Sequence, residues 1–125
     1  QPVLDRHCVA CHSPEKPEGG VLLTAEPERQ FSRSYCELVQ HVSYSAWKGP
    51  HGNHEPLTQP DVFGSRGSKL VKMLEAGHEQ VVLNEDDWSR LYTWIDANAL
   101  FYGTFDPADQ VRQLRGETID GPALE

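Results

Sequence analysis

The sequence contains no apolar run that approaches the roughly 20 residues of a membrane-spanning helix, so we expect no membrane span. Basic residues are also few: 11 Lys and Arg stand against 19 Asp and Glu, which gives a net charge of -8 at pH 7. Binding to nucleic acid relies on Lys and Arg that neutralise phosphates, so this balance argues against a nucleic-acid partner. An acidic surface suits a basic redox partner protein, or it serves only to keep the protein soluble.

Cysteine and methionine are scarce, with three Cys and one Met in 125 residues. No secretory signal peptide precedes the first Cys, and the chain begins at Gln1, so we expect a processed protein or a domain of a longer one. Cys8 and Cys11 lie close together in the sequence. Cys36 stands alone, and we expect it to be a small buried residue on a helix.

Glycine and proline are frequent, with 10 Gly and 9 Pro, which excludes long regular elements through much of the chain. Apolar residues nevertheless recur at helical spacing in several places. We expect helices over residues 2–8, 32–41, 69–76 and 84–98, and long loops over 13–30 and 48–67. We therefore expect an all-α domain at residues 1–106, followed by a tail at 107–125 with a weak helical signal at 108–115.

Capping residues support these helices. Ser32 and Ser68 are placed as N-caps of the second and third helices. Gly77 is placed to end the third helix in the left-handed conformation. Asn84 begins the last helix, and Asp87 is positioned for a capping-box contact there.

The stretch richest in chemistry is Cys8-Val9-Ala10-Cys11-His12. Two thiols three residues apart, followed at once by an imidazole, form the spacing by which c-type haem is attached. Each thiol can add to one vinyl group of the porphyrin, and the imidazole then lies where it can take the proximal position on the iron. The motif predicts one covalently attached haem c, held by Cys8, Cys11 and His12.

Three other interpretations of these residues remain open. A dithiol redox motif needs only Cys8 and Cys11, but it usually follows a strand, and no strand pattern precedes it here. A zinc site needs a fourth ligand beside these two thiols and His12, and the usual zinc motifs bring a second close pair. A disulfide between the two thiols closes too small a loop to constrain the unfolded chain much.

The second face of the iron takes another side chain or stays open. Met73 is a candidate because His/Met ligation is common in cytochromes, but its spacing places it on the inner face of its helix with Leu70 and Leu74. His78 follows Gly77 on a short connector between two helices. We predict that His78 is the distal ligand.

Four further histidines are candidates for the same role: His7, His41, His51 and His54. His7 lies on the same short segment as the proximal ligand, so we expect it to be exposed. His51 and His54 lie in a Gly-rich loop, where Glu55 would complete a transition-metal site. We expect both imidazoles to be exposed to solvent instead.

The order of these features resembles class I c-type cytochromes, and more closely the cytochrome c domains of planctomycete-type bacteria. The likeness is carried by residues 1–12, by Gly64 through Leu74, and by Leu91-Tyr-Thr-Trp-Ile-Asp-Ala-Asn-Ala99 with Phe101-Tyr-Gly103. Many such domains have a Met-Pro-Pro turn that supplies a distal Met before the Trp-Ile-Asp segment. Here His78 stands at that distance from Trp94, and the sequence has no Met-Pro-Pro.

The resemblance implies a class I-like cytochrome c fold, in which short helices and long loops wrap around one haem. It also implies bis-histidine ligation by His12 and His78. The Gly77-His78 pattern and the two C-terminal segments are similar to the C-terminal haem region of proteins related to the hydrazine synthase alpha subunit as well.

The motif and the resemblance together predict an electron-transfer cytochrome with a redox partner protein. Two imidazoles keep the iron ligation the same in both oxidation states. We therefore expect a lower reduction potential than His/Met ligation gives. The alternative is a haem domain whose open or labile distal site binds or converts a small ligand such as a nitrogen oxide or peroxide. Thioether attachment implies maturation outside the cytoplasm, so we expect a periplasmic or otherwise exported protein.

Overall fold

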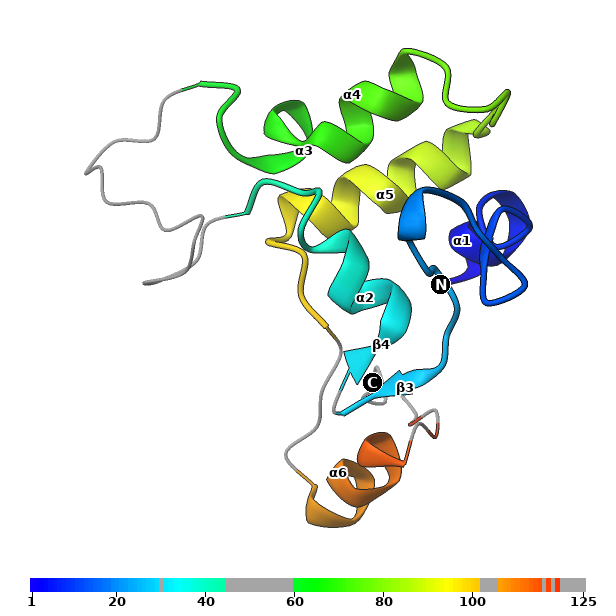
Figure 1. Cartoon of the computed structure of the whole chain (residues 1–125). Helices are drawn as coiled ribbons and strands as arrows, with labels where there is room; N and C mark the ends of the chain where they lie inside the picture. Colours follow the sequence, from blue (N-terminus) through cyan, green and yellow to red (C-terminus); the bar gives the residue numbers. More distant parts are fainter. Residues whose placement is uncertain (30, 45–59, 102–105, 116, 118, 120–125) are drawn as a thin grey trace.

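The structure is a computed structural model that describes residues 1–29, 31–44, 60–101, 106–115, 117 and 119. Helices are the main regular elements of this part (Figure 1). They are α1 (Pro2–His7), α2 (Arg33–Leu38), α3 (Gly64–Gly67), α4 (Lys69–Glu75), α5 (Glu85–Asp96) and α6 (Pro107–Leu114), with a 3-10 turn at Glu18–Gly20.

Two short antiparallel strand pairs lie between α1 and α2. The first joins β1 (His12–Ser13) to β2 (Lys16–Pro17), and the second joins β3 (Pro27–Glu28) to β4 (Phe31–Ser32). Each strand has two residues, which agrees with the Pro- and Gly-rich sequence of this region. These pairs fold the expected loop at 13–30 back on itself.

Two helices begin where their capping residues predict. The Ser32 hydroxyl accepts a hydrogen bond from the Tyr35 N–H at 3.2 Å and caps α2. The Asn84 side-chain oxygen accepts one from the Asp87 N–H at 2.9 Å and caps α5. Both helices end earlier than expected, α2 at Leu38 and α5 at Asp96.

Two expectations for the region before α4 are wrong. The expected loop at 48–67 contains helix α3 in its last four residues. The Ser68 side chain does not cap α4, because its hydroxyl donates to the Gly64 carbonyl at 2.8 Å and accepts from the Ser43 N–H at 2.8 Å. Ser68 is fully buried and joins α3 to the segment that follows α2.

The hydrophobic core lies among α2, α4 and α5. Figure 1 shows α5 running between α4 and α2, with α1 beside the N-terminal end of α5. Buried apolar side chains from these helices and their connections form the core: Leu23, Leu38, Val42, Leu70, Val71, Leu91, Ile95 and Ala99. On α4 the buried residues are Leu70 and Val71, whereas Met73 is 43% exposed. The buried face of this helix is therefore rotated by part of a turn from the face that the sequence predicts.

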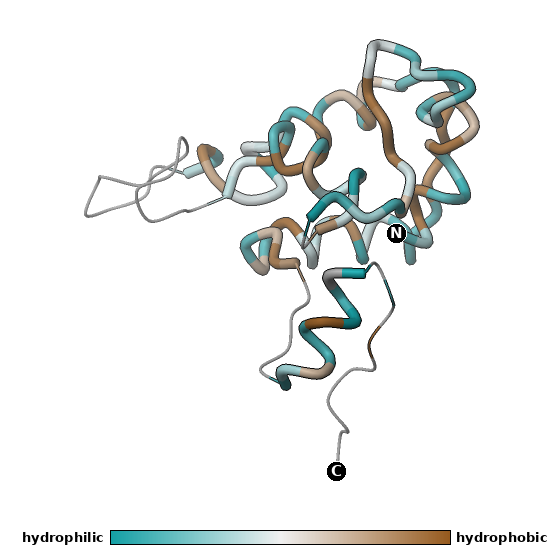
Figure 2. The backbone as a smooth tube through the Cα atoms, turned by 60° about the horizontal axis from the view of Figure 1, so that its bottom comes forward, coloured by the Kyte–Doolittle hydropathy of each residue, from teal (hydrophilic) through white to brown (hydrophobic). Residues whose placement is uncertain are grey.

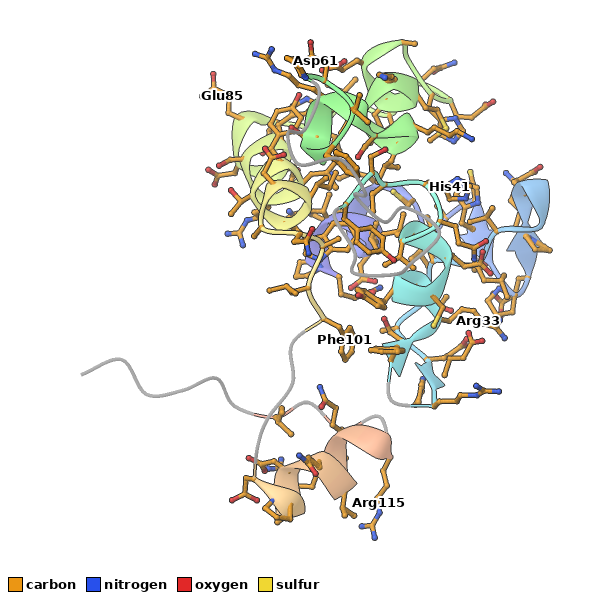
Figure 3. All side chains as sticks on the ribbon, turned by 90° about the vertical axis from the view of Figure 1, so that its left-hand side faces the viewer. Arg33, His41, Asp61, Glu85, Phe101 and Arg115 are labelled. Atoms are coloured by element: carbon orange, nitrogen blue, oxygen red, sulfur yellow. The ribbon has the colours of Figure 1, made fainter. Side chains whose placement is uncertain are left out.

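Aromatic rings hold the chain that follows α5 against α2. The Phe101 ring lies 5.2 Å from Phe31 and 5.0 Å from Tyr35, measured between centroids. The Tyr35 hydroxyl donates to the Ala99 carbonyl at 3.0 Å. Figure 3 shows Phe101 at the end of α2 that adjoins β4. The expected packing of residues 99–106 is confirmed for Phe101, while Leu100 is 68% exposed and residues 102–105 lie outside the described part.

Helix α6 confirms the weak helical signal in the C-terminal segment. The Asp106 carboxylate accepts hydrogen bonds from the Ala108 and Asp109 N–H groups, at 2.7 and 3.1 Å. Figure 2 shows α6 apart from the other helices, with polar and apolar residues alternating along it. The division of the chain at residue 106 stays a prediction. Across the residues described, no helix is both long enough and apolar enough to cross a membrane.

Gly67 occupies a place where only glycine fits. A Cβ at Gly67 would lie 2.2 Å from the Val62 carbonyl oxygen, a backbone atom held by the turn before α3. We predict that Gly67→Ala lowers the free energy of unfolding by about 2 kcal/mol or more. In the control Gly19→Ala the Cβ meets no atom within 4 Å, and only the positive φ of 63° opposes Ala. That control should lose about 1 kcal/mol, and equal losses in urea titrations would contradict the packing argument.

Candidate functional site

A cavity of about 600 Å³ opens beside the segment that carries Cys11 and His12. Its floor is apolar and includes Leu23, Leu38 and Leu70. A second cavity of about 110 Å³ shares these three leucines and both motif residues with it, and extends to Cys8. The combined space is of the size that holds small ligands and cofactors, roughly 300 to 1,000 Å³.

The motif residues reach this space through a tight turn after α1. The Cys11 and His12 N–H groups both donate to the Cys8 carbonyl at 3.0 Å. The Cys8 N–H in turn donates to the Leu4 carbonyl at 2.8 Å, so the turn continues directly from the helix. The turn thereby places Cys8, Cys11 and His12 in the wall of the smaller cavity, and Cys11 and His12 also in the wall of the larger one.

The His12 ring is oriented by the backbone. Its Nδ1 lies 3.3 Å from the Val21 carbonyl oxygen. A carbonyl oxygen only accepts, so Nδ1 carries a proton, and in the neutral ring Nε2 is the nitrogen with the lone pair. Metal-binding histidines commonly have this arrangement, in which a backbone carbonyl fixes the ring and its tautomer.

The His78 ring faces the His12 ring across the cavity. The ring centroids lie 6.0 Å apart, and the ring planes differ by 14°. A bond from a metal to an imidazole nitrogen is about 2 Å long, and the ring centre lies about 1 Å behind that nitrogen. Two imidazoles on opposite sides of one metal ion therefore have centroids roughly 6 Å apart. The observed centroid spacing matches this distance, and the two rings are nearly parallel and stacked.

The turn that carries His78 has an unusual backbone. Gly77 ends α4 with a φ of 91°, as expected from the sequence, but Glu79 and Gln80 also have positive φ values, 46° and 64°. Non-glycine residues in this region each cost on the order of 1 kcal/mol, and such residues concentrate at functional sites. A hydrogen bond of 2.8 Å from the Val81 N–H to the His78 carbonyl closes the turn.

Met73 faces the cavity, not the core. It lines both cavities together with His12 and His78. The expectation that it packs inside the helix bundle is wrong, because α4 turns Leu70 and Val71 inward and leaves Met73 exposed. The thioether is thus a second candidate ligand on the same wall as His78.

A buried carboxylate ties the motif segment to α5. Asp87, whose side chain is completely buried, accepts hydrogen bonds from Arg6 and from His7 Nε2, the latter at 2.9 Å. The hydrogen bond from His7 and then the nearby charge of Arg6 hold the pKa of Asp87 below its usual value. The Asp87 N–H makes the expected capping contact with Asn84, but the Asp87 carboxylate binds His7 and does not complete a capping box. The expected exposure of His7 is wrong for the same reason.

The remaining candidates divide between the cavity and the rest of the chain. His41 lines the larger cavity. Cys36 lies on α2, partly buried, and all three cysteines are free thiols. His51 and His54, with Glu55, lie outside the described residues, so the expectation for that loop is untested.

The electrostatics of the motif do not match a redox dithiol. Burial, with a smaller contribution from Cys11, raises the pKa of Cys8. Reactive dithiols have lowered thiol pKa values instead. Among the described residues, no group of three or more His, Cys, Asp or Glu side chains is placed to hold a metal ion by itself. Haem iron needs only one or two protein ligands, because the porphyrin supplies the others.

Comparison of the chain with protein-family models, with curated proteins and with solved structures finds no match.

We predict that the Asp87 contact stabilises the fold mainly above pH 4. A carboxyl group whose pKa is lowered by folding stabilises the native state when ionised, and this contribution is lost as the pH falls through the folded pKa. Asp87→Asn should be destabilised at pH 7 and should lose less further stability on acidification than the parent chain. Urea titrations from pH 7 to about 3 measure both effects, across the range in which a free Asp titrates.

The control is Asp86→Asn, which removes a neighbouring exposed carboxylate from the same first turn of α5. It should leave the pH dependence nearly unchanged. Matching acid profiles for the Asp87 and Asp86 variants would contradict a special role for the buried contact.

Proposed function

We propose that this chain is an electron-transfer protein with one haem c, attached through Cys8 and Cys11 and ligated by His12 and His78. The observation that carries the proposal is the approach of the two imidazoles, 6.0 Å between centroids, across a cavity that both thiols also line. The Nδ1 contact of His12 with a carbonyl supports the same ligand role.

The chain's own residues would hold and tune the group. When bound, haem supplies a reversible one-electron change between ferric and ferrous iron. Cys8 and Cys11 would hold it covalently, and His12 and His78 would supply the two nitrogen ligands. The leucines of the cavity floor would keep water from the ring. Two neutral nitrogen ligands would give a lower potential than a His/Met site does.

The proposal extends to fold, location and partner. Helices α1 and α5, which meet through Asp87 on one side of the cavity, support a class I-like cytochrome c arrangement around the haem. Thioether attachment supports a periplasmic or otherwise exported protein. The net charge of -8 supports a basic redox partner protein.

The left-handed turn at His78 and the exposed Met73 favour one alternative function. In it, the distal ligand is labile, and a small molecule such as a nitrogen oxide or peroxide binds at that face. In this alternative Cys8, Cys11 and His12 have the same roles. Only the ligand at the sixth coordination position of the iron differs.

Ligand assignment is tested by absorption spectra of the purified protein. We predict a low-spin ferric spectrum without the far-red band of Met-ligated haem. His78→Ala should become high-spin or five-coordinate and bind CO rapidly when reduced, because its distal nitrogen is gone. Met73→Leu, which alters the neighbouring side chain on the same wall, should leave the spectrum unchanged. A spectral change in Met73→Leu with none in His78→Ala would overturn bis-histidine ligation, and rapid CO binding by the parent chain would favour the alternative function.

Covalent attachment has its own test. The Cys8→Ala/Cys11→Ala double variant should release its haem to acidified acetone, whereas the parent chain should retain it after denaturation. Cys36→Ala is the matched control, because Cys36 lines neither cavity, and it should retain haem fully. A colourless parent protein, produced with a cytochrome c maturation system, would refute the proposal.

A further inference from the structure

The two ends of the cavity differ in character. The part that includes Cys8 is walled by apolar side chains of α1, α5 and the connector before α5, among them Leu4, Leu83 and Leu91. The other part is rimmed by charged and polar groups: Lys16, Glu18, His41 and Lys69. None of these four lines the part beside Cys8. The cavity therefore runs from an apolar end at one thiol to a polar mouth.

His41 and Lys69 stand together at this mouth. The Leu70 N–H donates to the His41 carbonyl at 3.0 Å, which brings the chain after α2 against the start of α4. Figure 3 shows His41 where the chain after α2 approaches α4 and the N-terminal segment. Within the described part of the chain, neither side chain has an ion pair or hydrogen-bond partner, and both are exposed.

The other charged groups at the rim are either paired with a neighbouring group or negatively charged. Lys16 lies 3.7 Å from Glu18 and 3.6 Å from the Cys11 sulfur, so its charge is partly compensated near the thiols. Glu79 follows His78, lines both parts of the cavity and repels anions. An anionic ligand group is therefore directed toward His41 and Lys69.

We infer that His41 and Lys69 bind the two carboxylate groups of the haem; this inference rests on the proposed function. A haem joined to Cys8 and Cys11 through its vinyl positions carries its two carboxylates on the opposite edge of the ring. That edge would extend away from Cys8, toward the part of the cavity that His41 and Lys69 line. Ammonium and imidazole N–H groups are the donors that pair with carboxylates, and they offset the cost of bringing these anions to the mouth of an apolar cavity.

The test uses the haem-loaded full chain and reads the carboxylates directly. Resonance Raman bands from bending of the haem carboxylate side chains report their hydrogen bonding. We expect these bands to shift in Lys69→Gln and in His41→Asn, and to shift further when both substitutions are combined. Lys72→Gln is the charge-matched control on the same helix, since Lys72 lies outside the cavity lining, and its bands should stay at the parent position.

The outcomes separate this inference from the proposed function. All four substituted chains alter exposed side chains, so they should fold and carry haem like the parent. Unchanged bands in Lys69→Gln and His41→Asn, in a protein that carries haem, would overturn the carboxylate assignment and leave the cytochrome intact. Shifts of equal size in Lys72→Gln would overturn it also. A parent chain without attached haem would overturn both.

Discussion

The contact of Asp87 with Arg6 and His7 is the interaction on which the site depends. A buried carboxylate is stable only when cationic or hydrogen-bonding partners compensate its lost hydration. Both partners lie on or at the end of α1, and Asp87 lies in the first turn of α5, so the pairing fixes the first helix against the last long one. Because Cys8 follows His7 directly, the position of both thiols relative to the core is set by this pairing.

The cavity is assembled from segments that are far apart in the chain. The thiols and His12 come from the turn after α1, His41 from the chain after α2, and Met73 and His78 from α4 and the turn beyond it. Each segment is attached to the core by buried apolar residues next to it, such as Leu23, Leu38 and Leu70. The polar groups that face the cavity are thus held by hydrophobic packing behind them, which keeps the two imidazoles at a fixed separation.

Local signals in the sequence were sufficient to predict the helices other than α3. Caps at Ser32 and Asn84 and the glycine at the end of α4 act over three or four residues, so pattern alone locates them. The pairing of His7 with Asp87 spans 80 residues, and no local pattern specifies which partner a buried carboxylate finds. The orientation of Met73 was missed because one residue of error in the buried face rotates a short helix by about 100°.

The left-handed backbone at Glu79 and Gln80 restricts which sequences can build this turn. Side chains branched at Cβ are strongly disfavoured at positive φ, whereas glycine, asparagine and aspartate are tolerated. Divergent relatives that retain the turn should therefore carry only a few residue types at these two positions, even though both side chains are exposed. A valine or isoleucine at either site in such a relative would indicate a chain that positions the histidine equivalent to His78 by a different backbone conformation.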